Sequence, residues 1–167
     1  VEDFPVERWD AIIAINLTSA FHATRLALPA MKAANWGRIV FISSESGINT
    51  PGEMVHYGMT KAAQLSVARG LAETCTGSGV TVNSVLPGPT RTEGVATFFG
   101  RLAEEQGVTV EEAERAFFAN ARPTSIIKRL IDPAEVAAMV AYVCSPLSSA
   151  TQGAALRVEG GVVRSMV

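Results

Sequence analysis

The chain has 167 residues, of which 48% are hydrophobic and 18% are charged, and its formal net charge is -2. A chain of this length and composition can bury the core of one domain, which excludes a disordered or acidic-tail protein. No block of Lys and Arg marks a surface for nucleic acid or for a membrane. We therefore expect a globular protein that acts on small molecules.

The first half of the chain predicts a helix, a strand and a second helix. Apolar residues recur at helical spacing over 6–34, which predicts a long amphipathic helix that ends at Gly37. The short, β-branched and almost wholly apolar run within 36–44 is typical of a strand covered on both faces of a parallel sheet. Residues 56–76 return to the helical period, and the "GSG" at 77–79 ends that helix.

The second half completes an α/β pattern. Two further buried strands are predicted at 80–86 and 154–158, and the helix between them begins with Asp132 as N-cap. The strand within 36–44, the helix at 56–76 and the strand at 80–86 form a βαβ unit with a right-handed crossover. No repeat or linker divides the chain, so we expect residues 1–167 to form one unit. Its fold class is α/β, a partial Rossmann-like, doubly wound parallel sheet of about three strands with flanking helices.

Residues 93–131 have a different character from the rest. They contain two predicted helices, and the second begins with a capping box from Thr109 to Glu112. We expect four aromatic side chains to be exposed there: Phe98, Phe99, Phe117 and Phe118. A mobile lid over a substrate has this character.

Cysteine usage and hydropathy bear on the compartment. Cys75 and Cys144 show no spacing typical of a metal site or a disulfide framework, so we expect reduced thiols and no metal. No apolar run approaches the roughly 20 residues of a membrane span, and the N-terminus has no signal-peptide character. We expect a cytoplasmic protein. Val1 stands where a helix is about to begin, as in a fragment.

The candidate chemistry lies in "ISSESGINTPGEMVHYGMTKAAQ". Tyr57 and Lys61 are four residues apart, so they share one face of a helix. A cation beside a phenol favours the phenolate, and the pair can then act as a general acid and base. Ser44 ends the first strand, where open α/β sheets bind ligands, and its hydroxyl could hydrogen-bond a carbonyl or alcohol. By itself the Tyr/Lys spacing is more typical of a solvated helix surface, and it is Ser44 after a buried strand, with a second buried strand ending in Pro87-Gly88, that favours a site.

With these residues in order, the sequence resembles the short-chain dehydrogenase/reductase family, in its compact single-domain branch. The matching segments run along the chain as "ERWDAIIAINL", "GRIVFISSESG", "YGMTK", "VTVNSVLPGPTRT" and "LRVEGG". The resemblance implies an oxidoreductase that interconverts a small-molecule carbonyl and an alcohol with NAD or NADP. It implies Tyr57 as proton donor and Ser44 as the group that polarises the substrate. Lys61 would lower the pKa of Tyr57 and hold the nicotinamide ribose.

The resemblance also assigns roles to residues outside this trio. It implies that Asn16 kinks the long helix and holds a water in a proton relay. The alternative for Asn16 is a core amide satisfied by a neighbouring backbone. Pro87, Gly88, Thr90 and Thr92 match the segment that wraps the nicotinamide, although a simple strand-ending turn would use the same Pro and Gly.

Other residues near the motif are assigned by position only. Glu45 and Met54 flank the candidate site, as does His56, and could line the substrate pocket or simply pack at its rim. We expect His22 to be structural or to lie at a subunit contact. The family's dimer contacts run along the helices matching 6–34 and 56–76, which implies a homodimer or homotetramer.

One part of the family pattern is absent. No strand is followed by Gly-x-x-x-Gly-x-Gly, the turn that holds the pyrophosphate, and the residue that selects NAD or NADP is missing as well. About 90 residues of a family-sized domain are unaccounted for. One interpretation is the C-terminal portion of an ordinary enzyme, shortened by cloning, proteolysis or a gene-model error. A second is a catalytically silent binding or oligomerisation module, and a third is a nucleotide-sugar epimerase or dehydratase.

Overall fold

The computed structural model describes residues 2–166, in which helices and parallel strands alternate. The elements are α1 (Val6–Ile13), a π-helical turn (Ala14–Thr18), α2 (Ser19–Ala33), β1 (Gly37–Ile42), α3 (Val55–Thr74), β2 (Val80–Pro87), α4 (Glu93–Gln106), α5 (Val110–Asn120), α6 (Pro133–Cys144) and β3 (Ala155–Val158). Short 3-10 turns lie at Glu45–Gly47, Gly52–Met54 and Pro146–Ser148. This order confirms the predicted α/β class.

The three strands form one parallel sheet in the order β1-β2-β3. Gly37 pairs with Val80 at the start of β1, and Ser84 pairs with Ala155 at the start of β3. The central strand β2 is buried along almost its whole length, as the sequence predicts. β1 is less covered than expected, and Ile42 is 46% exposed, because within residues 2–166 only β2 pairs with it.

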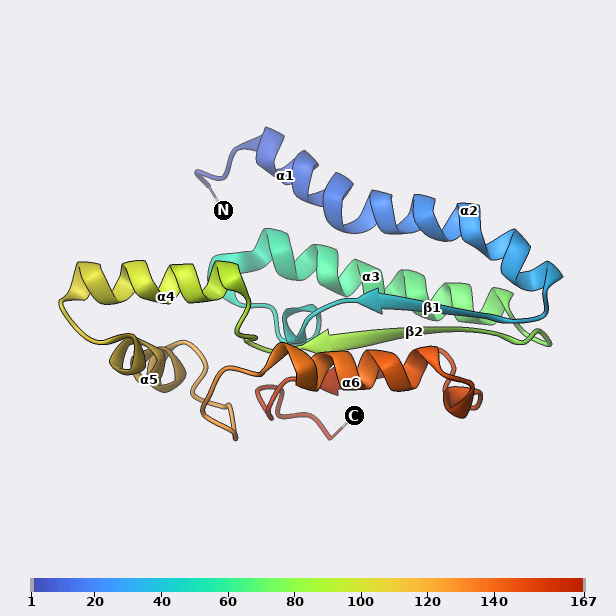
Figure 1. Ribbon diagram of the computed structural model, residues 1–167. Coiled ribbons are helices and arrows are strands. Elements are labelled where there is room, and N and C mark those ends of the chain that lie inside the picture. The colour runs from blue at the N-terminus through green and yellow to red at the C-terminus, as the bar shows by residue number, and fades with distance from the viewer. Residues whose placement is uncertain (1, 167) are drawn as a thin grey trace.

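Helices cover both faces of the sheet (Figure 1). The α1–α2 helix and α3 lie on one face, and α6 lies on the other. The core between the sheet and α3 contains Phe41, Val80 and Val82, and Ala68 and Ala72 face them from the helix. The inner face of α2 packs against the same core. Burial of these apolar side chains is the main free energy that holds the layers together.

The predicted helix over 6–34 is confirmed, with two differences. It is interrupted by the π-helical turn, and it ends at Ala33 because Gly37 is already the first residue of β1. By length and composition alone, the stretch Val6–Ala33 could cross a membrane, which differs from the expectation that no apolar run has that length. Its inner face packs on the core, and Asn16 in it bonds to Thr60 and Gln64 of α3, while 6% of its most apolar stretch is buried.

Two helix starts follow the predicted capping chemistry. The Thr109 side chain accepts from the Glu112 amide while the Glu112 side chain accepts from the Thr109 amide. Asp132 and Glu135 make the same reciprocal arrangement at α6, with Pro133 in the first helical position. Both pairs satisfy amides that a helix N-terminus otherwise leaves unpaired.

The segment 93–131 forms two helices beside the carboxyl ends of the strands (Figure 1). The expectation of four exposed aromatics is wrong for Phe99 and Phe118, which are each 2% exposed. They form a small core of their own with Leu130, and Phe117 packs against it. Phe98 is 54% exposed, as predicted. The segment therefore has internal packing that holds its two helices together.

Candidate active site

A large cavity opens at the carboxyl ends of β1 and β2, where parallel sheets bind ligands. Its volume is about 1160 Å³, larger than the pockets that hold drug-sized molecules. It brings together the predicted site residues Ser44, Glu45, Met54, Tyr57, Lys61, Pro87, Gly88, Thr90 and Thr92. Asn16 is the one predicted site residue that does not line it.

The loop after β1 is fixed against α3, which places Ser44 beside the Tyr57/Lys61 face. The Ser43 hydroxyl donates to the Lys61 carbonyl at 2.8 Å. A Cβ at Gly47 would lie 2.9 Å from the Lys61 carbonyl carbon, so only glycine allows the loop to approach this closely. Ser44 itself is 6% exposed. The geometry of the serine therefore depends on backbone contacts to the helix that carries the tyrosine.

The Ser44 hydroxyl is held by its sequence neighbours. It donates to Glu45 Oε2 at 2.6 Å and accepts from the Ser46 amide at 3.1 Å. A hydroxyl has one proton to donate and two lone pairs to accept with. In this arrangement the proton points at the carboxylate, and a lone pair remains available to a donor in the cavity.

The pKa of Tyr57 is raised above its ordinary value of 10.0. Burial is the main cause, because it disfavours the charged phenolate. A hydrogen bond with Ser44 acts in the opposite direction, and the negative charge of Glu45 raises the pKa further. This direction differs from the sequence expectation that the neighbouring cation favours the phenolate. Tyr57 is thus held in its protonated form, the form that can donate a proton.

The Lys61 ammonium lies over the Tyr57 ring. Its Nζ lies 5.5 Å from the centre of the Tyr57 ring and donates to the Ile42 carbonyl at 2.9 Å and to Gln64 Oε1 at 3.3 Å. Burial lowers the pKa of Lys61, since the ammonium loses hydration. Two acceptors therefore fix the ammonium at the end of β1.

Asn16 connects to the site through α3. It lies in the π-helical turn, and its Nδ2 donates to Thr60 Oγ1 at 3.0 Å. Thr60 Oγ1 in turn donates to the Tyr57 carbonyl at 2.8 Å, and Gln64 Nε2 donates to the Asn16 carbonyl. The helix irregularity implied by the resemblance is present. A side-chain hydroxyl satisfies the amide, instead of the backbone group that the alternative interpretation required.

The segment after β2 forms a tight turn along one wall of the cavity. The Gly88 amide donates to the Val158 carbonyl at 3.0 Å, and a Cβ on Gly88 would lie 2.8 Å from Glu159 Cα. Thr90 Oγ1 donates to the Gly88 carbonyl at 2.9 Å. Thr92 caps α4 by accepting from the Val95 amide at 3.3 Å. Both threonine hydroxyls therefore have partners within the chain.

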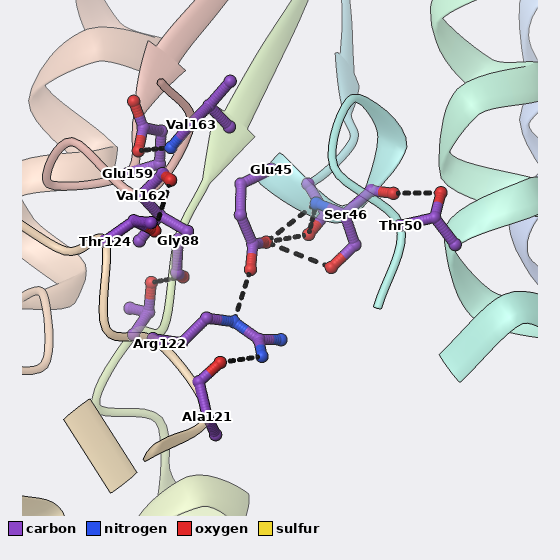
Figure 2. Close-up of polar contacts among 12 residues, drawn as sticks. Glu45, Ser46, Thr50, Gly88, Ala121, Arg122, Thr124, Glu159, Val162 and Val163 are labelled. Atoms are coloured by element: carbon purple, nitrogen blue, oxygen red, sulfur yellow. Dashed lines mark hydrogen bonds and ion pairs between the residues drawn. The ribbon is translucent and has the colours of Figure 1, made fainter. Parts of the chain in front are cut away.

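Sequence reasoning missed Arg122, which joins the site from the segment after α5. Its Nε donates to Glu45 Oε1 at 3.2 Å, and the two side chains point toward one another in Figure 2. The two residues are 77 positions apart, so no local pattern pairs them. The available signal was Glu45 itself, because an acidic residue between two buried serines needs a partner.

Of four other residues discussed from the sequence, only Cys144 lines the cavity. His56 stacks on Phe4, with ring centres 4.2 Å apart, and does not line the cavity. His22 lies 5.9 Å from the Phe21 ring. Cys75 is a buried free thiol. Cys144 is an exposed free thiol at the cavity wall.

Known proteins resemble the chain over nearly its whole length. A family model described as enoyl-(acyl carrier protein) reductase matches residues 1–163. The uncharacterized oxidoreductase YvaG of Bacillus subtilis is 49% identical over 98% of this chain. A D-beta-hydroxybutyrate dehydrogenase of Cupriavidus necator is 37% identical over 98%. The chain spans 62% of the length of each of these two relatives.

Solved structures share the architecture. A variant of actinorhodin polyketide ketoreductase with NADPH matches with a TM-score of 0.85 and 31% identity, over 96% of this chain and 61% of that one. The L-sorbose reductase of Gluconobacter frateurii, complexed with NADPH and L-sorbose, matches with a TM-score of 0.91 and 22% identity. That match covers 99% of this chain and 62% of the reductase, and it bears on the fold alone.

Proposed function

This chain belongs to the short-chain dehydrogenase/reductase family, and on that premise we propose that it carries the proton-transfer residues of an oxidoreductase. The proposed reaction interconverts a small-molecule carbonyl and an alcohol with a nicotinamide cofactor. The observation that supports it most is the meeting of Ser44, Tyr57 and Lys61 on one cavity at the carboxyl ends of the strands.

In the reducing direction, Tyr57 donates a proton to the carbonyl oxygen. The phenol is protonated at neutral pH, and the direction of its pKa shift, above 10.0, favours that form further. To orient the same oxygen, the Ser44 hydroxyl beside Tyr57 turns its proton from Glu45 Oε2 into the cavity. The Lys61 ammonium, held by the Ile42 carbonyl, stabilises the phenolate that remains after transfer. In the oxidising direction the same groups act in reverse, and Tyr57 is the base.

The cavity fits a nicotinamide cofactor. Its volume exceeds that of a single small substrate, and one wall is the turn of Pro87, Gly88, Thr90 and Thr92. We propose that these residues, with Tyr57 and Lys61, hold the nicotinamide end of NAD or NADP. Bound there, the cofactor supplies or accepts the hydride. Asn16 supports the site at a distance, through Thr60 and the backbone of Tyr57.

We propose that the substrate enters beneath the segment 93–131 as beneath a lid. Phe98, Phe99 and Phe117 from that segment face the cavity, and Met54 lies on its rim with Glu45. Apolar aromatic groups beside a few polar ones are typical of small-molecule pockets. The hydroxybutyrate of one relative and the polyketide of one solved structure define the first carbonyl compounds to try.

We also propose that the chain forms one structural unit, the C-terminal portion of the dinucleotide-binding domain, and works in the cytoplasm. No strand within residues 2–166 is followed by a glycine-rich phosphate turn. We therefore expect the 167-residue chain to bind NADH and NADPH weakly or not at all. Fluorescence titration tests this, and a micromolar dissociation constant would show that the phosphate turn is dispensable.

The activity test uses the longest natural form of the protein that carries this sequence. Purified protein is mixed with NADH or NADPH and a panel of ketones, keto acids and keto sugars, and loss of cofactor absorbance is followed. The proposal predicts turnover with at least one carbonyl class. Absence of turnover in a protein that binds the cofactor would contradict it.

A second candidate function is assembly. Apolar side chains are exposed along α1–α2, including Ile15 at 70% and Leu26 at 82%. Such a surface is typical of a contact with a partner, and we propose a second copy of the chain, as homodimer or homotetramer. A chain that assembles but binds no nicotinamide in any natural form would favour a silent module over the enzyme.

A further inference from the structure

Glu45 is a carboxylate enclosed between the candidate catalytic serine and a lid arginine. Glu45 is 5% exposed, and four donors surround its two oxygens. Oε2 accepts from the Ser44 hydroxyl at 2.6 Å, the Ser46 amide at 2.9 Å and the Ser46 hydroxyl at 3.2 Å. Oε1 accepts from Arg122 Nε at 3.2 Å (Figure 2). The carboxylate is therefore fully satisfied and fixed in direction.

The hydrogen bond from Ser44 decides which way that hydroxyl can act. Ser44 has one proton, and Glu45 competes for it with the Tyr57 phenolate. A hydrogen bond from Ser44 lowers the pKa of Tyr57 because the serine proton stabilises the phenolate. While that proton points at Glu45, the phenolate lacks this donor and the protonated tyrosine is favoured. A residue that directs this proton therefore shifts the balance between the phenol and the phenolate of Tyr57.

The charges around Tyr57 come from three parts of the chain. Lys61 faces it from α3, and Glu45 faces it from the loop after β1. Arg122, from the segment after α5, acts through Glu45 and also lies 3.8 Å from the carboxylate of Glu53. Arg122 is 13% exposed in its side chain, so water screens its attraction for Glu45 only weakly.

We propose that Glu45 and Arg122 are positioning residues: Glu45 directs the hydroxyl proton of Ser44 away from Tyr57, and Arg122 holds that carboxylate and balances its charge. This rests on the proposed function of Ser44 and Tyr57. Arg122 belongs to the lid, where its guanidinium packs on the Phe117 ring at 5.8 Å and donates to the Ala121 carbonyl. The position of the lid is thereby linked to the acidity of the tyrosine.

The test measures the titration of Tyr57 directly and needs neither cofactor nor substrate. The chain has two tyrosines, Tyr57 and Tyr142, so a Tyr142→Phe background leaves one phenol to follow by ultraviolet absorbance of the phenolate. Into this background go Glu45→Gln, Arg122→Gln and the double variant. Arg91→Gln is the matched control, because Arg91, just before the segment 93–131, pairs with Glu114 of that segment and not with Glu45. Circular dichroism at each pH confirms that the fold persists.

The order of the Tyr57 pKa values follows from the charges, because each single variant removes one charge near the phenol. Glu45→Gln lowers the pKa of Tyr57 by removing the carboxylate, and Arg122→Gln raises it by leaving that carboxylate unbalanced. The double variant follows Glu45→Gln, and the control titrates as its parent does. A folded Arg122→Gln that titrates as the parent does would overturn the proposal. If Arg122→Gln does not fold, Glu45→Gln decides alone, and a pKa not below the parent's overturns it.

Because the titration involves no turnover, its failure is separate from failure of the proposed reaction. A protein that reduces carbonyls with an unchanged tyrosine titration would retain the function and lose this inference. A protein whose Tyr57 titration shifts as expected but that reduces no carbonyl would retain this inference and lose the proposed reaction.

Discussion

The candidate site and the outer surface of the α1–α2 helix differ in how many of their side chains have partners within the chain. At the carboxyl ends of the strands, Ser44, Glu45 and Ser46 are buried and bonded to one another, and Arg122 reaches in from a distant segment. Along α1–α2, by contrast, Ile15 and Leu26 are mostly exposed. The difference teaches that the contacts around the candidate proton-transfer residues lie inside this chain, whereas the outer surface of α1–α2 is left uncovered by residues 2–166.

The largest effect at the candidate site is expected from Tyr57→Phe, measured in the natural form of the protein that shows activity. Loss of the phenol removes the proton donor, and we expect the turnover number to fall by about a thousandfold, within the usual range for a general acid. The phenyl ring keeps the packing, so circular dichroism and thermal unfolding stay close to the parent. Normal turnover in this variant would sink the assignment of Tyr57.

A second comparison sets the buried ion pair against an exposed one. Arg122→Met leaves the Glu45 carboxylate buried without its partner, and we expect the free energy of unfolding to fall by about 3 kcal/mol. Arg91→Met breaks a pair whose arginine is 51% exposed, and we expect a loss below about 1 kcal/mol. Urea unfolding measures both. Equal losses would show that burial does not distinguish the two pairs.

The pH dependence of stability gives a smaller effect at the candidate site. Burial lowers the pKa of Lys61 from 10.5, so the folded state disfavours the ammonium relative to the unfolded state. The contribution of Lys61 is present above pH 10.5 and is lost as pH falls through the lowered folded pKa. We therefore expect the difference in unfolding free energy between Lys61→Met and the parent to grow in favour of the variant as pH falls through this window. A pH-independent difference from urea unfolding would contradict this.

The smallest effect is expected on the outer helix. Leu26 is 82% exposed, so Leu26→Gln removes little buried apolar surface, and we expect the unfolding free energy to change by less than about 0.5 kcal/mol. Sedimentation shows whether the same change separates assembled copies. A large loss of stability in a protein that sediments as a monomer would mean that Leu26 is covered within the chain.

Local patterns predicted the parts of the fold that neighbouring residues determine. The caps at Thr109 and Asp132 follow from side chains three positions apart, and the burial of β2 follows from its continuous apolar run. The trio of Ser44, Tyr57 and Lys61 lies on two adjacent elements, so its spacing was enough to bring it to one cavity.

Features that depend on distant contacts were not predicted. The partner of Glu45 comes from 77 positions away, and the burial of Phe99 and Phe118 depends on how α4 and α5 pack together. The direction of the Tyr57 pKa was wrong for a similar reason. The sequence shows the nearby cation, but the amount of water excluded from the phenol is known only once the chain has folded.

The π-helical turn at Ala14–Thr18 has a consequence for the length of its helix. A π turn holds one more residue than an α turn, so the helix contains a residue that its two ends do not require. Deleting Ile15, which is 70% exposed, would give a regular helix whose two flanking faces keep their orientation. The cost would be the shape of the turn that presents the Asn16 carbonyl to Gln64 and its amide to Thr60. The one extra residue of the π-helical turn therefore lets this helix contact Thr60, whose hydroxyl bonds to the backbone of Tyr57.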